Sequence, residues 1–160
     1  MISNCTFVGN STSAFGGAVY GTKSTTIVDC SFVTNLSSST ASCIYWKNGT
    51  NLVDRCSFLG NVASATDSGS GCVVFSQLGK NMAARQVVRN SLFAGNMSVK
   101  KGASVASCSG DTGCTPSMQE FLFENCTFAQ NRVDFKSTQY GAIRCTGDYV
   151  ICATNCLFYG

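Results

Sequence analysis

The chain has 160 residues, of which 44% are hydrophobic and 12% are charged, and its formal net charge is +3. This composition supplies a core for one domain and excludes a disordered tail or a nucleic-acid-binding arm. No apolar run approaches the roughly 18–20 residues that cross a bilayer, and no signal peptide is visible at the N-terminus. Eleven cysteines are many for a cytosolic protein. We therefore expect residues 1–160 to form a single domain cut from a longer extracellular or cell-surface chain.

A motif of the form C-x-F-x-x-N recurs along the chain. Its first copy runs from Cys5 to Asn10, later copies follow at intervals of 25 to 35 residues, and serine replaces cysteine in the fourth copy, at Ser91. Phenylalanine is present in six copies, as Phe7, Phe32, Phe58, Phe93, Phe128 and Phe158. Cysteine is present in five copies, as Cys5, Cys30, Cys56, Cys126 and Cys156. Repetition at this period is typical of a solenoid in which each repeat forms one coil.

Each coil is expected to contain three short strands. An apolar residue stands three positions before the cysteine, and the residue directly before the cysteine, such as Asn4, favours a tight left-handed bend. Cys-x-Phe then points inward again with period two, and a second motif of small residues and valine or isoleucine follows, as at 17–19. The pattern predicts an all-β, right-handed parallel β-helix with three sheets, about five to six coils and open coils at both ends. Coils stacked about 4.8 Å apart should form ladders of phenylalanine rings, asparagine amides and inward thiols.

Four further cysteines bracket loops. Cys108 and Cys114 flank the longest loop, and Cys145 and Cys152 flank the equivalent loop one coil later. We expect a local disulfide in each loop, and hence an oxidising compartment.

Two more cysteines, Cys43 and Cys72, occupy equivalent positions on neighbouring coils. They could form a disulfide or stack as thiols. Zinc binding is not expected for any of the cysteines, because zinc sites use paired ligands at short spacing and usually some histidine, which this chain lacks.

Candidate contact sites lie in loops and in a basic segment. The repeat lengths place insertions at 76–85 and 108–119, which we expect to protrude from one corner of the coil and to contact a partner. Of six Asn-x-Ser/Thr sequons, five lie in asparagine columns, which leaves Asn48 as the candidate glycosylation site. One segment without acidic residues is a candidate patch for anionic glycans or, alternatively, a solvated face, and it contains Lys80, Arg85, Lys100 and Lys101.

Catalysis is not expected, and no cofactor or metal is predicted. Polysaccharide-cleaving sites need carboxylates that converge on one face, to hold calcium or to act as acid and base. Asp54, Arg89 and Glu124 instead stand two residues before the cysteine position on successive coils, which predicts a surface ladder of alternating charge. A cluster of Asp29, Asp54 and Arg55 in a groove, with bound calcium, would favour an enzyme.

The segment Phe7–Asn10 (F-V-G-N), followed by Gly16–Val19 (G-G-A-V), resembles the repeats of the chlamydial polymorphic outer membrane proteins. The first half of this pattern recurs along the whole chain, whereas the second half is complete once and is close to complete at 141–143. The resemblance implies a pectate-lyase-like right-handed β-helix and a surface passenger domain that acts as an adhesin.

Three functional hypotheses follow. The favoured one is a non-enzymatic cell-surface or extracellular module that binds a glycan or protein receptor through protruding loops. The alternatives are a structural rod in an extracellular filament, with end-to-end contact between coils, and a polysaccharide-active enzyme. No nucleic-acid partner and no membrane-spanning segment are expected.

Overall fold

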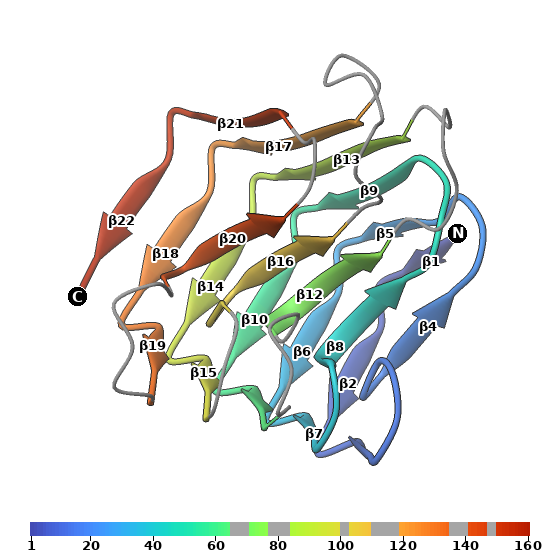
Figure 1. The fold of residues 1–160 in the computed structure, drawn as a ribbon, viewed down its shortest axis with the longest axis vertical. Helices are drawn as coiled ribbons and strands as arrows, with labels where there is room; N and C mark the ends of the chain where they lie inside the picture. Colours follow the sequence, from blue (N-terminus) through green and yellow to red (C-terminus); the bar gives the residue numbers. More distant parts are fainter. Residues whose placement is uncertain (65–70, 77–83, 100–102, 110–118, 135–140, 147–149) are drawn as a thin grey trace.

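The computed structural model describes residues 1–64, 71–76, 84–99, 103–109, 119–134, 141–146 and 150–160. In this part of the chain the regular structure is β-strand, and no helix is long and apolar enough to span a membrane. The strands form four parallel sheets, here called A to D, in which each strand pairs with the equivalent strands of the coils before and after it (Figure 1). This stacking of parallel strands is that of a β-helix or related solenoid.

Sheets A and B contain six strands each. Sheet A consists of β1 (Ile2–Ser3), β5 (Thr26–Val28), β9 (Asn51–Asp54), β13 (Ala84–Arg89), β17 (Gln119–Glu124) and β21 (Val150–Thr154). Sheet B consists of β2 (Thr6–Val8), β6 (Ser31–Val33), β10 (Ser57–Leu59), β14 (Leu92–Ala94), β18 (Thr127–Ala129) and β22 (Leu157–Tyr159).

Sheets C and D contain five strands each. Sheet C consists of β3 (Ser11–Thr12), β7 (Leu36–Ser37), β11 (Val62–Ala63), β15 (Met97–Ser98) and β19 (Arg132–Val133). Sheet D consists of β4 (Val19–Gly21), β8 (Ala41–Trp46), β12 (Gly71–Ser76), β16 (Ala106–Ser109) and β20 (Ile143–Thr146).

The prediction of three sheets is wrong, because each of the five complete coils contains a fourth strand segment. The residue before the ladder asparagine takes a left-handed φ, for example 61° at Gly9, 51° at Thr34 and 51° at Gln130. The chain therefore turns between the phenylalanine and the asparagine motif positions, and the two residues after the asparagine pair as a separate strand of sheet C. The bend predicted before the cysteine is confirmed, with φ between 50° and 55° at Asn4, Asp29, Arg55, Asn90, Asn125 and Asn155.

The predicted phenylalanine ladder is present inside sheet B. Successive motif phenylalanines are register partners. Their ring centroids lie 4.5–5.4 Å apart, and the rings are within 8° of parallel. Phe32, Phe58 and Phe93 are completely buried, whereas Phe158 in the last coil is 51% exposed. Each buried ring thus depends on the coils on both sides of it.

The predicted asparagine ladder is also present, at the turn between sheets B and C. The amide nitrogen of Asn35 donates to Asn61 Oδ1 at 3.0 Å, and that of Asn61 donates to Asn96 Oδ1 at 2.9 Å. Asn10 and Asn131 extend the row at its two ends. The amides of Asn35, Asn61, Asn96 and Asn131 also bond to backbone groups of neighbouring coils, so the ladder fixes the spacing of the turns.

The small residues of the second motif allow close contact between coils. A Cβ atom on Gly17 would lie 2.1 Å from the backbone oxygen of Ser42 in the next coil, and one on Gly16 would lie 2.2 Å from Val19 O. Gly16 also has a φ of 62°, which side-chain-bearing residues rarely adopt. Glycine is therefore required here by space and by backbone conformation.

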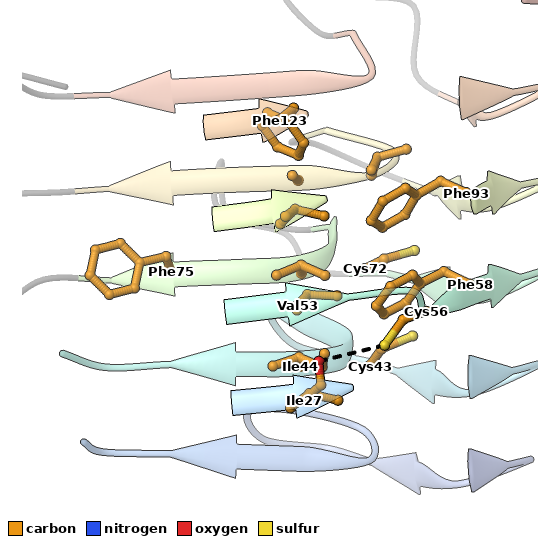
Figure 2. Close-up of a cluster of buried hydrophobic side chains, with 14 of the residues drawn as sticks. Ile27, Cys43, Ile44, Val53, Cys56, Phe58, Cys72, Phe75, Phe93 and Phe123 are labelled. Atoms are coloured by element: carbon orange, nitrogen blue, oxygen red, sulfur yellow. Dashed lines mark hydrogen bonds between the residues drawn. The ribbon is translucent and has the colours of Figure 1, made fainter. Parts of the chain in front are cut away.

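Figure 2 shows the core that these ladders enclose. Sheet D supplies Ile44, Val73 and Phe75, sheet A supplies Val53 and Phe123, and all are completely buried. They meet the phenylalanine ladder of sheet B in one continuous cluster.

Candidate functional site

The predicted contact loops fall mostly outside the described residues. The loop sites at 76–85 and 108–119 therefore stay predictions. Of the basic patch, the structure describes Arg85 on β13, whose Nε lies 3.1 Å from Glu120 Oε2 on β17. Arg85 is thus paired with an acid of the adjacent strand. Four residues with predicted roles lie outside the described part: Lys80, Lys100, Lys101 and Cys114.

The prediction of local loop disulfides is wrong. Cys108 on β16 is bonded to Cys145 on β20, with a Cα–Cα distance of 4.5 Å. The two residues are register partners, because parallel stacking brings equivalent positions of successive coils together. Cys152, the predicted partner of Cys145, is a free thiol on β21 in a different sheet. The disulfide therefore links two coils and leaves neither loop closed by a bond of its own.

The cysteine column before sheet B behaves as scaffold. The thiol of Cys30 donates to the carbonyl two residues earlier at 3.2 Å, and Cys56 makes the same bond at 3.3 Å. Ser91, which replaces cysteine in the fourth copy, makes it at 2.7 Å. Burial raises the pKa of the Cys56 and Cys126 thiols to about 11. Such thiols stay protonated at neutral pH and are poor nucleophiles and metal ligands.

A shallow groove runs beside this column, where sheet A turns into sheet B, and we call it the bend groove. It consists of two adjoining hollows, of about 470 and 480 Å³, that share Arg55 and Ser57 in their walls. It crosses five coils along the stacking direction. Besides residues of the cysteine column, its lining comprises Asn4, Thr6, Asp29, Ser31, Arg55, Ser57, Asn90, Leu92, Asn125 and Thr127.

Asparagine amides in the bend groove form a second ladder, in the asparagine column that stands one residue before the cysteine. Asn155 donates to Asn125 Oδ1 at 2.8 Å, Asn125 donates to Asn90 Oδ1 at 3.1 Å, and Asn90 donates to Asp54 Oδ1 at 2.8 Å. Asn125 thereby uses one N–H and one carbonyl lone pair, while a primary amide has two of each. Because Asn125 is exposed, the remaining donor and acceptor are available to a ligand.

Charged side chains replace the amides in the second and third coils. Arg55 bonds to both oxygens of Asp29, through Nε at 2.8 Å and Nη2 at 2.9 Å. Its Nη1 also lies 3.0 Å from Asp54 Oδ2. Asp54 is 3% exposed and accepts further bonds from Arg89 and Asn90. The predicted pair of Asp54 and Arg89 is therefore present, but the expectation that Asp54 lies on the surface is wrong.

This cluster is suited to holding the coils together rather than to acid catalysis. The hydrogen bonds from Arg55 lower the pKa of Asp29. Burial acts to raise the pKa of Asp54, but the bonds from Arg89 and Asn90 outweigh it, and that pKa is also lowered. A general acid in glycoside cleavage needs a raised carboxyl pKa. Both carboxyls are thus held in their ionised form.

An aromatic cluster that no repeat motif predicts lies on the outer side of sheet D in the first two coils. The rings of Tyr20 and Tyr45 stack at 5.6 Å, and Phe15 packs on Tyr45 at 4.7 Å. Phe15 and Tyr20 are about half exposed, whereas Tyr45 is nearly buried. Phe15 therefore covers Tyr45 and forms part of the surface.

The candidate glycosylation site, Asn48, lies in the turn between β8 and β9 and is partly exposed. Among the other sequons, Asn35 and Asn96 are completely buried, so a glycan cannot be attached to them in the folded chain. No group of three or more His, Cys, Asp or Glu side chains that could hold a metal ion occurs in the described part of the chain.

Comparison of the chain with protein-family models, curated proteins and solved structures finds no match.

Proposed function

We propose that this chain is a non-enzymatic module of an extracellular or cell-surface protein, and that it binds a glycan of the surface it contacts. The bend groove is the observation that carries the proposal. It crosses five coils along the stacking direction and is lined mainly by amides and hydroxyls at nearly constant spacing. An extended chain of sugar units, which presents hydroxyl groups along its length, matches such a lining better than a folded protein surface does.

The scaffold supports this role because it holds the groove rigidly. The second asparagine ladder and the Asp29–Arg55–Asp54 cluster fix the groove walls through side-chain hydrogen bonds. Binding groups that are ordered before the ligand arrives lose less conformational entropy on binding. The lowered pKa values of Asp29 and Asp54 make both carboxyls unsuited to the general-acid role of glycoside cleavage, which supports binding over hydrolysis at this groove.

The proposal also includes the handedness of the solenoid. Connections between parallel strands of one sheet are right-handed in nearly all proteins, and every pairing in sheets A to D is parallel. We therefore take the coil to be a right-handed β-helix. The resemblance to surface passenger repeats agrees with this choice.

The test uses two tryptophan variants on one strand. Ser57 lies in the wall shared by both hollows, and Leu59 stands two residues later on the same outward side of β10. In a glycan array followed by titration of any sugar bound, Ser57→Trp should weaken binding at least tenfold, and Leu59→Trp should leave it unchanged. Equal binding by both variants and wild type would refute a role for the groove.

Loop variants distinguish the groove from the predicted contact loops. Shortening 76–85 and 108–119 should leave glycan binding unchanged if the bend groove is the site. If the loop variants lose glycan binding and Ser57→Trp keeps it, the binding site lies in the loops and not in the bend groove. If the chain binds a cell-surface protein and this binding does not depend on a glycan, the glycan proposal is refuted and a protein receptor is favoured.

A structural rod is the second candidate function. The ladders of phenylalanine, asparagine and backbone bonds, together with a disulfide between coils, supply the stiffness that a spacer needs. A wild-type chain that binds no glycan and no cell surface would favour this candidate.

A further inference from the structure

We propose that Cys43 and Cys72 form a second disulfide between coils inside sheet D when the chain folds in an oxidising compartment. The proposal is independent of the glycan site. It concerns two thiols that the core buries beside each other.

The register of β8 and β12 brings the two residues opposite each other. Ala41 pairs with Gly71 and Ile44 pairs with Val73, with a register shift between these two pairs. Two residues of β8 in this interval, one of them Cys43, therefore face a single residue of β12, which is Cys72. A bulge of this kind changes the direction of side chains locally.

Both thiols point into the core. Cys43 is 0% exposed and Cys72 is 1% exposed, and both belong to the main hydrophobic cluster. Figure 2 shows them entering the core from neighbouring strands, one above the other. Burial first, and then the adjacent thiol of Cys72, raises the pKa of the Cys43 thiol. Both are free thiols in this structure, and the Cys72 thiol donates to Ser104 O at 3.5 Å. The strand register and the shared burial place the two residues side by side in the core.

The same sheet already contains a bond of the proposed kind. Cys108 and Cys145 are bonded across β16 and β20 from directly paired positions. The spacing between coils in sheet D is therefore compatible with a disulfide between stacked cysteines. Cysteines of the column before sheet B differ, because Ser91 replaces one of them and keeps its hydrogen bond to a carbonyl.

The chemistry requires an oxidant, for which a small-molecule disulfide such as oxidised glutathione is sufficient. The Cys43 thiolate attacks one sulfur of that disulfide and releases one glutathione thiolate. The Cys72 thiolate then attacks the mixed disulfide at the Cys43 sulfur and releases the second glutathione. The two protein protons end on the two glutathione thiolates, so the protein loses two hydrogen atoms in all. Because both thiols are buried in the folded core, exchange has to occur before the coils close.

Peptide mapping of the wild-type chain tests the proposal. The chain is refolded in a glutathione redox buffer, denatured with N-ethylmaleimide and digested with chymotrypsin without reduction. Cleavage after Phe32 and Phe58 separates Cys43 from Cys30 and Cys72 from Cys56. We expect segment 33–45 cross-linked to a peptide that ends at Phe75, with a mass two hydrogens below the sum of the two thiol peptides. Maleimide on both Cys43 and Cys72, or a cross-link from either to another cysteine, would overturn the proposal.

A stability measurement gives a second readout. In the Cys108→Ser/Cys145→Ser background, reduction should lower the melting temperature by on the order of 10 °C, because a loop of roughly thirty residues is released. Adding Cys43→Ala and Cys72→Ala should abolish the difference between oxidised and reduced samples. An equal melting temperature with and without reductant in the first background would contradict the proposed bond.

Discussion

Removing one amide from the middle of the asparagine ladder should destabilise the chain far more than removing one from its end. Asn61 is completely buried and its side chain makes four hydrogen bonds. Its Nδ2 donates to Phe32 O and Asn96 Oδ1, and its Oδ1 accepts from the backbone and side-chain nitrogens of Asn35, all at 2.9–3.0 Å. At about 1 kcal/mol of net stability for each bond, and more for each buried group left unpaired, Asn61→Ala should cost about 4 kcal/mol.

Asn10 is the matched control, because it holds the same motif position in the first coil and is exposed. Its side chain makes one ladder bond, to Asn35 Oδ1 at 2.9 Å, so Asn10→Ala should cost about 1 kcal/mol or less. The free energies of unfolding can be measured in urea, with the fluorescence of the single tryptophan, Trp46, as a buried probe. A difference between the two variants of less than 1 kcal/mol would refute the ladder as a main source of stability.

Three further predictions follow from the glycine contacts and from titration. Gly17→Ala should destabilise the chain by several kcal/mol, since its Cβ would lie 2.1 Å from a backbone oxygen. Gly141 holds the same motif position, but a Cβ there would meet nothing within 4 Å, so Gly141→Ala should be nearly neutral. Equal unfolding midpoints for the two variants would contradict this prediction. The lowered pKa of Asp29 means that its bonds to Arg55 stabilise the fold above about pH 4 and that this contribution is lost on acidification. The melting temperature of Arg55→Gln should therefore fall less than that of the wild-type chain between pH 6 and about pH 3. Cys56 has a pKa of about 11, against 9.0 for an ordinary thiol. The contribution of this thiol to the free energy of unfolding is therefore constant below about pH 9 and is lost between about pH 9 and 11. Over that interval the stability of Cys56→Ser should decline less steeply than that of the wild-type chain.

The parts of the fold that repeat in sequence were predictable, because equal residues at equal positions must stack when coils stack. The phenylalanine ladder, the buried asparagine ladder and the bend before the cysteine follow from this reasoning. Sheet C does not, since its strands are two residues long and too short for any alternation of polar and apolar residues to show. The left-handed residue before each ladder asparagine was the available signal, and glycine in three copies, at Gly9, Gly60 and Gly95, marks it.

Two contacts between coils outside the repeated motif were not predicted correctly: the partner of Cys145 and the burial of Asp54. Cys145 lies nearer to Cys152 than to Cys108 along the chain, but in space the register of β16 and β20 decides the pairing. Asp54 occupies a position that is exposed in an isolated strand, yet Arg55 and Arg89 cover it from its own coil and the next. For Cys145, insertions of different length between the motifs conceal the register that decides the pairing. For Asp54 the register was predicted, and the burial depends on how far the stacked arginine side chains cover the carboxyl.

The substitution at Ser91 shows what the cysteine column does and limits what the cysteine count can mean. Ser91 Oγ accepts the backbone N–H of Cys56 in the preceding coil at 3.1 Å and donates to the carbonyl of Arg89 at 2.7 Å. A hydroxyl and a thiol can both accept and donate in this way, so the position requires a small group that bridges two coils rather than sulfur chemistry. Five of the eleven cysteines are therefore explained by packing and hydrogen bonding in any compartment. The expectation of an oxidising compartment is then supported by cysteines of sheet D, through the bond between Cys108 and Cys145 and the proposed bond between Cys43 and Cys72.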